Sequence, residues 1–195
     1  MILPIVAYGS PVLRKVGIKI DENYPGLEEL IINMKETMEN AQGIGLAAPQ
    51  IGKSIRLFIV DTSPFGEDES LEDQERAYLS KFKRVFINAQ LLDEEGDEWV
   101  FNEGCLSIPD IREDVFRQPK ITLKYLDENF VEHTETIEGL AARVVQHEYD
   151  HIEGILFTDK ISSLKKRLIK KKLENISKGK ITVDYRMKFP LLKRK

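Results

Sequence analysis

The segment 139–157, GLAARVVQHEYDHIEGILF, constrains the fold of this chain most strongly. It contains no proline, and its apolar residues and both of its histidines recur at helical spacing. We therefore expect one helix that ends near Gly154, because glycine suits the residue after a helix end. The helix is apolar around most of its length, so it should be buried at the centre of the molecule.

Other segments predict the elements around this helix. Helical spacing favours an amphipathic helix over 25–41 and a lysine-rich one over 162–179. Strand-like runs occupy 55–61, 84–92, 98–104, 121–127 and 131–139, and the last two should form a hairpin that turns at 127–129. Residues 181–189 alternate like an edge strand. The prediction is an α+β fold: short, mostly antiparallel strands around a central helix, plus a C-terminal helix and terminal strand.

Length and charge patterning predict a single domain over 1–195, because 195 residues suit one core better than two. The acidic stretch 62–83 is expected to be a solvated, mobile insertion with a short helical turn near its end. Residues 161–195 are expected to form the basic C-terminal helix and strand.

Composition also excludes some classes of function. The net charge of −4 argues against a general nucleic-acid binder, so we expect no DNA partner. No apolar run approaches the roughly 20 residues of a membrane span, so we expect no membrane contact. The opening MILPIVAYGS lacks the basic region of a signal peptide, and Cys105 is the one cysteine. Both features favour a reducing, cytoplasmic setting.

His147 and His151 lie four residues apart, so a helix would point both imidazoles at one metal ion. Glu148 follows the first histidine and can reach a water on that metal, which is the HExxH arrangement of hydrolytic metal sites. A catalytic site of this kind needs a third protein ligand.

Several residues compete to be the third ligand. One metalloprotease family has a histidine where this chain has Phe157, so that pattern fails. Glu174 lies in the lysine-rich helix and His133 in a polar strand, and a solvated surface explains both better. Cys105 remains: a thiolate with two imidazoles suits iron(II), zinc or nickel(II).

Three motifs carry a family resemblance. GIGLAAPQ (43–50), EGCLSIP (103–109) and QHEYDH (146–151) resemble the signature motifs of the peptide deformylases, in the same order. PVLRK at 11–15 and Arg112 are also similar, and the likeness runs from about residue 5 to residue 160. The resemblance implies removal of the formyl group from the N-terminal methionine of new polypeptides.

The resemblance also implies roles for particular residues. Cys105, His147 and His151 would hold a divalent metal, most simply iron(II), with zinc or nickel as alternatives. Glu148 would be the general base, and it would pass the water's proton to the leaving amine. Gln50 and the backbone N–H of Leu106 would donate to the developing oxyanion.

The substrate residues follow from the same motifs. Gly45 would pair with the substrate backbone, and Glu103 and Gly104 belong to the second motif beside it. An ion pair between Glu103 and Arg112 would shape that loop. The residues expected around the methionine pocket are Ile44, Phe101, Leu140 and Val144, with the stem of Arg143 at its rim.

Two alternatives stay open on the sequence alone. The first is a metalloprotease that cleaves internal peptide bonds, against which the cysteine ligand and the GIGLAAPQ motif argue. The second is a non-catalytic module that binds nascent chains, for which the loss of Glu148 would be the signal. The formylmethionyl nascent peptide is the expected partner, and the basic run over 165–172 is a candidate contact with ribosomal RNA.

Overall fold

The computed structural model describes residues 1–191. The helices are α1 (Leu27–Asn40), α2 (Asp73–Leu79), α3 (Gly139–Ile152) and α4 (Ser163–Ser177). The strands are β1 (Ile5–Val6), β2 (Gly45–Ala47), β3 (Leu57–Asp61), β4 (Lys83–Glu95), β5 (Trp99–Cys105), β6 (Ile108–Arg117), β7 (Lys120–Leu126), β8 (Glu132–Glu138) and β9 (Met187–Lys188).

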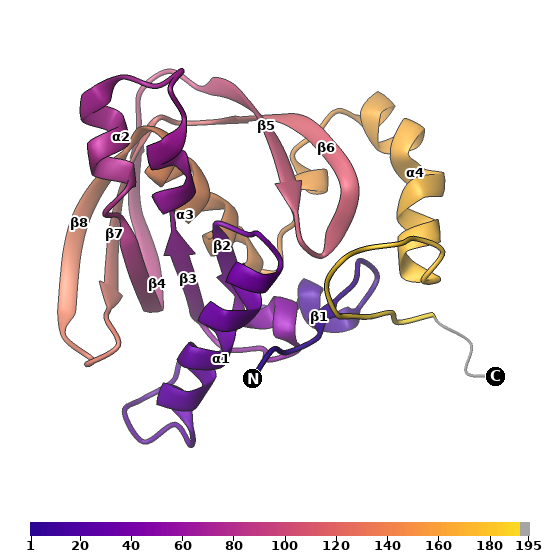
Figure 1. The fold of residues 1–195 in the computed structure, drawn as a ribbon, viewed down its shortest axis with the longest axis horizontal. Helices are drawn as coiled ribbons and strands as arrows, with labels where there is room; N and C mark the ends of the chain where they lie inside the picture. Colours follow the sequence, from indigo (N-terminus) through magenta and orange to yellow (C-terminus); the bar gives the residue numbers. More distant parts are fainter. Residues whose placement is uncertain (192–195) are drawn as a thin grey trace.

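The predicted α+β fold is confirmed. Five strands form one antiparallel sheet in the order β2-β3-β4-β7-β8, and β5 and β6 form a separate hairpin. Helix α3 lies at the centre, with the sheet on one side and the hairpin on the other (Figure 1). Its apolar face packs into the main core, where Ala141 and Val145 are fully buried. The glycine after its C-cap, Gly154, has a φ of 73° and ends the helix as expected.

Strand β6 is the longest strand that the sequence did not predict. A proline within a run of residues argues against a strand, but Pro109 lies inside β6. The ladder pairs Cys105 with Ile108 and then Gly104 with Arg112, so the proline falls in a bulge between the two pairs. A bulged residue need not donate to the ladder, and proline is tolerated there.

The C-terminal end of the chain differs in part from the prediction. Helix α4 begins after Ser162, whose hydroxyl accepts from the N–H of Lys165 at 3.2 Å. The terminal strand is much shorter than 181–189, because only β9 is regular, and it pairs in parallel with β1. The predicted C-terminal unit runs to residue 195, and its last four residues lie outside the described part.

The acidic stretch 62–83 contains more structure than one helical turn. A 3-10 helix, η3 (Ser63–Glu67), precedes α2 within it. Phe65 and Leu71 pack against the main core, and Phe82 is buried. The segment is therefore exposed to solvent on one side and packed against the main core on the other.

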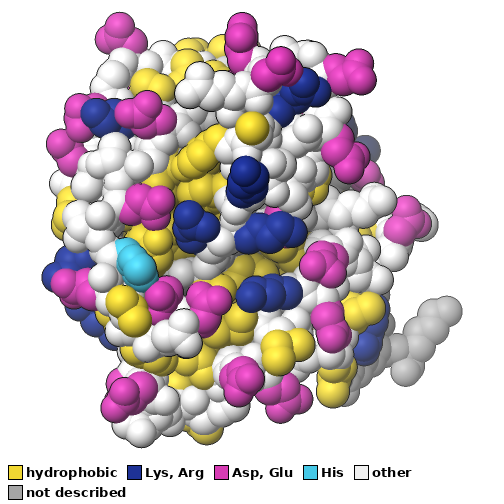
Figure 2. Space-filling model, turned by 60° about the vertical axis from the view of Figure 1, so that its left-hand side comes forward, with side chains coloured by type: hydrophobic (Ala, Val, Ile, Leu, Met, Phe, Trp, Pro, Cys, Tyr) yellow, Lys and Arg dark blue, Asp and Glu magenta, His cyan; other side chains and the backbone are white. Residues whose placement is uncertain are grey.

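On the side of the molecule seen in Figure 2, Lys and Arg side chains gather in the middle over an apolar area, and acidic side chains lie around them. On the sheet, Lys124 pairs with Glu132 at 2.9 Å and Lys120 with Glu95 at 3.3 Å. Among the helices described for residues 1–191, none has the length and apolar character that a bilayer crossing requires.

Candidate metal centre

Three donor side chains meet where α3 faces the end of the β5–β6 hairpin. Cys105 is the last residue of β5, and His147 and His151 lie one turn apart on α3. One ligand atom from each residue lies within 4.8 Å of the others, and the Cys105 Sγ to His151 Nε2 distance is 3.3 Å. Soft sulfur with two imidazole nitrogens is a donor set for a divalent transition metal, so the residues fit such an ion.

The side chain of Gln50 is oriented towards this cluster. Gln50 belongs to the 3-10 helix η2 (Ala48–Ile51), and its Oε1 accepts from the N–H of Ala47 at 2.8 Å. Because a backbone N–H can only donate, the carboxamide oxygen must face Ala47 and the NH2 must face the other way. The Nε2 atom lies 3.4 Å from Cys105 Sγ, so this amide presents a donor at the metal centre.

Glu148 is buried beside the same cluster. Its side chain is 4% exposed, and its Oε2 has no hydrogen-bond partner among the described residues 1–191. Burial raises the pKa of its carboxyl to about 7, a value suited to a group that takes up and releases a proton. The carboxylate lines the cavity described below.

Gly45 makes room for this carboxylate. A Cβ atom at Gly45 would lie 2.5 Å from Glu148 Oε1 and 2.7 Å from its Cδ. These distances are far below van der Waals contact, so any side chain at this position would displace the carboxylate. The sequence interpretation of Gly45 concerned the substrate backbone; the structure adds this second reason for a glycine.

Gly45→Ala is therefore expected to lower kcat by about 100-fold, since a displacement of about 1 Å at a reacting group can cost that much. Metal content should stay unchanged. The control is Gly43→Ala, whose added methyl would meet the flexible end of Leu106 at 2.7 Å and should cost less. Equal kcat values for the two variants in a steady-state assay would show that the space beside Glu148 does not matter for the reaction.

A buried ionic network orients His147. The Glu103 carboxylate accepts from Arg117 Nε at 2.7 Å, from Arg143 Nη1 at 3.1 Å and from His147 Nδ1 at 2.9 Å. Arg117 also donates to Asp150 at 2.7 Å. Burial opposes ionisation of Glu103, but the hydrogen bonds from His147 and Arg117 hold its pKa well below its usual range. With Nδ1 engaged, the Nε2 of His147 is left to bind metal.

The expected ion pair between Glu103 and Arg112 is wrong. Arg112 is exposed and donates to the side chain of Asn102 at 2.9 Å. Glu103 pairs across the hairpin with Glu113, and alternation along β6 puts Glu113 and Arg117 on the same buried face. Arg112 lies on the opposite face, so Arg117 is the partner.

A cavity of about 950 Å³ opens onto the metal centre. Its size is at the upper end of the range of small-ligand pockets. Of the residues predicted to contact substrate or to carry the reaction, those that line it are Ile44, Gly45, Gln50, Phe101, Glu103, Gly104, Leu106, Arg143, Val144 and Glu148.

Two of the pocket predictions need correction. Leu140 lies in the first turn of α3, packs in the main core and borders a different depression with Tyr78 and Leu79. Arg143 lines the cavity, but it is 2% exposed and lies beneath the rim. Its guanidinium lies over the ring of Trp99, 4.5 Å from the centroid.

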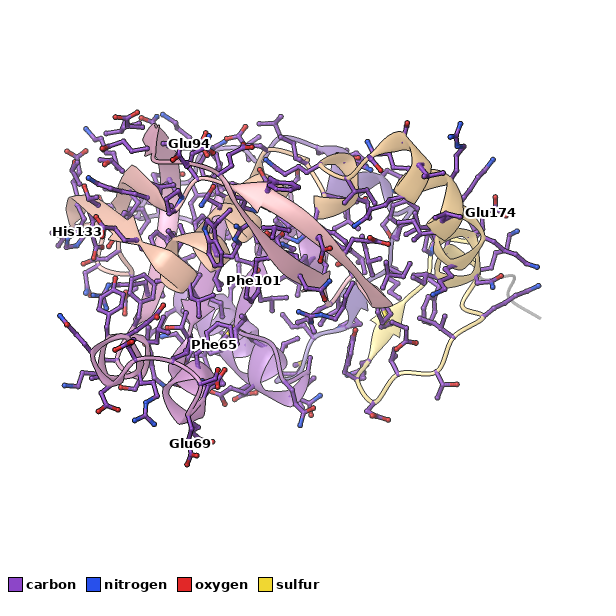
Figure 3. The ribbon with its side chains drawn as sticks, turned by 90° about the horizontal axis from the view of Figure 1, so that it is seen from above. Phe65, Glu69, Glu94, Phe101, His133 and Glu174 are labelled. Atoms are coloured by element: carbon purple, nitrogen blue, oxygen red, sulfur yellow. The ribbon has the colours of Figure 1, made fainter. Side chains whose placement is uncertain are left out.

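Sequence reasoning missed several contributions to the cavity, among them an aromatic side chain and a segment near the C-terminus. Phe65, from the acidic stretch, lies near Phe101 at the centre of the molecule (Figure 3), and both line the cavity. Four consecutive residues near the C-terminus, 182–185, form a further part of the wall. An aromatic side chain close to the start of a polar stretch was the available signal for Phe65.

The two rejected ligands lie far from the cluster. His133 and Glu174 occupy opposite ends of the molecule (Figure 3). His133 stacks on Tyr125 and lies 2.8 Å from Asp127, and Glu174 lies 3.7 Å from Lys178. Both have the surface roles that the sequence favoured.

Comparison with known proteins agrees with this geometry. The family model described as polypeptide deformylase matches residues 2–167. A peptide deformylase of Christiangramia forsetii is 64% identical over 194 residues, covering 100% of this chain and 99% of that protein. The one from Flavobacterium psychrophilum is 62% identical over 194 residues. A crystal structure of a peptide deformylase from Legionella pneumophila superposes with a TM-score of 0.77 at 35% identity, covering 92% of this chain and 98% of that one.

Proposed function

The chain belongs to the polypeptide deformylase family and removes the N-formyl group from nascent polypeptides, and we propose that Glu148 is the base that drives this hydrolysis. We propose Cys105, His147 and His151 as the metal ligands. The observation that carries the assignment is the meeting of these three donor groups within 4.8 Å, beside a buried carboxylate and below a cavity.

The residues would share the reaction as follows. A divalent metal held by the three ligands would supply the Lewis acidity that activates water and polarises the formyl carbonyl. Glu148 takes the water's proton and then protonates the amine as the C–N bond breaks, which releases formate. Gln50 Nε2 and the N–H of Leu106 donate to the oxygen as it becomes negative.

The methionine side chain would occupy the apolar part of the cavity. Ile44, Phe101 and Val144 line it, and Phe65 lies near Phe101. These side chains come from different elements, so the pocket depends on the tertiary fold. The buried Arg143 contacts Glu103 beneath the surface and supports the wall from behind.

Formate release from a short N-formylmethionyl peptide tests this function. Protein purified without oxygen should release formate, and the N-acetyl peptide should yield no acetate. A chelator should abolish the release, and added iron(II) should restore it. Cleavage at an internal bond would favour a protease, and binding without any release would favour a module that only holds nascent chains.

We propose iron(II) as the native metal, with zinc and nickel as possible occupants, and the cytoplasm as the place of action. The soft thiolate with two imidazoles supports a first-row metal of this kind. Iron(II) and thiolate are both oxidised readily, so a reducing compartment would preserve the site.

We also propose that the basic face of α4 contacts the ribosome. Arg167, Lys170, Lys171 and Lys172 are exposed, and none of them pairs with a carboxylate within the described part of the chain. Phosphate backbones attract such a surface in a salt-dependent way. Charge reversal at Lys170 and Lys171 should therefore weaken co-sedimentation with ribosomes, whereas Lys35→Glu on the exposed face of α1 should not. Association that does not respond to salt would contradict this proposal.

A further inference from the structure

The metal-binding cysteine and the proposed oxyanion donor flank a two-residue turn. Cys105 pairs with Ile108, so Leu106 and Ser107 alone connect β5 to β6. Neither has a positive φ, whereas the two-residue turns favoured in hairpins need at least one. The intrinsic preference of a two-residue turn therefore does not stabilise this connection. Contacts with other segments of the chain must hold it in place.

Both carbonyl groups of the turn are held by distant segments. The Ser107 oxygen accepts from the backbone N–H of Tyr8 at 2.8 Å. The Leu106 oxygen accepts from the hydroxyl of Tyr185 at 2.8 Å. The N–H groups of Leu106 and Ser107, by contrast, have no acceptor among residues 1–191. The turn is thus bonded through its carbonyls while its amides, that of Leu106 included, stay available.

The segment that carries Tyr185 is firmly anchored. After α4, residues 182–185 pass along the cavity, and β9 then pairs with β1. The N–H of Ile5 donates to the oxygen of Arg186 at 2.8 Å, and the N–H of Leu191 donates to Ser177 at 3.0 Å. Figure 1 shows this last stretch of chain beside β1 and below the β5–β6 hairpin. The backbone on either side of Tyr185 is therefore held in place where its side chain contacts the turn.

The position of Tyr185 also favours a donor role. Its ring and the side chain of Leu106 both pack against the second core cluster, around Met34 and Leu46. Burial raises the pKa of the Tyr185 hydroxyl, so it stays protonated and able to donate. The family match ends at residue 167, so this residue lies outside the matched region.

We propose that Tyr185 is a positioning residue for deformylation: its hydroxyl fixes the Leu106–Ser107 turn so that the N–H of Leu106 faces the reacting carbonyl. The inference rests on the proposed function, because it assigns a support to one of its two oxyanion donors. A donor that moves away from the oxygen loses most of its effect in the transition state and little in substrate binding.

Tyr185→Phe tests this inference, since it removes the one hydroxyl and keeps the ring. We expect kcat to fall about 10-fold, because only part of the 10²–10³-fold effect of an oxyanion donor would be lost. KM, metal content and Tm should stay near those of the wild type. Tyr8→Phe is the matched control, because Tyr8 reaches the turn through its backbone.

Three results would overturn the inference. An unchanged kcat in Tyr185→Phe would show that the hydroxyl has no part in the reaction. A higher KM with the same kcat would make Tyr185 a wall of the cavity only, and a lower Tm or loss of metal would make it a structural residue. If the wild-type protein itself releases no formate, the proposed function fails, which is a separate outcome.

Discussion

Glu148→Gln should lower kcat for formate release by about 10²–10⁴, the usual contribution of a positioned general base. Glutamine has nearly the same shape, so it should fill the space beside Gly45, but it cannot take a proton from water. The side chain does not belong to the three-donor cluster, so the variant should keep its metal. Steady-state kinetics and metal analysis on the same preparation measure both effects.

The control for this variant is Glu153→Gln. Glu153 is the C-cap of α3 and pairs with Arg56 at 2.5 Å, and it does not line the cavity. Its kcat should stay within about two-fold of the wild type, because the side chain lies outside the cavity wall. If Glu148→Gln kept more than about a tenth of the wild-type kcat, Glu148 would not be the general base.

Arg117→Met should destabilise the protein by about 3–5 kcal/mol, the cost of removing one partner from a buried ionic network. Arg117 is 2% exposed and donates to both Glu103 and Asp150, so both carboxylates would lose a buried donor. Typical domains are stable by about 5–15 kcal/mol, so the loss would be a large share of the total. Urea unfolding of metal-free protein would measure it without a contribution from bound metal.

Arg112→Met is the matched control, because Arg112 lies on the exposed face of the same strand. It should change the free energy of unfolding by less than about 1 kcal/mol. Equal losses in the two variants would mean that the buried network contributes no more than a surface arginine does.

The features that the sequence predicted correctly depend on local spacing or on donor chemistry. The i,i+4 rule places His147 and His151 on one face of α3 whatever surrounds the helix. Cys105 followed by elimination, because a solvated surface explained Glu174 and His133 better, and the structure places its Sγ close to both histidines. The order of the three motifs then identified the family.

The features that were missed depend on contacts far apart in the chain. Strand β6 was not predicted because Pro109, which lies in a bulge, argued against a strand. Without that strand, the alternation of side chains that places Arg117 on the same face as Glu103 could not be predicted. Leu140 and Val144 share a helix face, but the first turn of α3 lies against the core and away from the cavity. Tyr185 reaches the turn across 79 residues of sequence, and no local pattern encodes that contact.

X-ray absorption at the metal edge, on protein loaded with one equivalent of iron(II) or zinc, would identify the ligands of the ion. We expect one sulfur and two imidazole nitrogens from the protein around the ion, and loss of the sulfur signal in Cys105→Ser. Glu148→Gln should leave the spectrum essentially unchanged. A spectrum with no sulfur ligand in the wild-type protein would contradict the assignment of Cys105, His147 and His151 as the metal site.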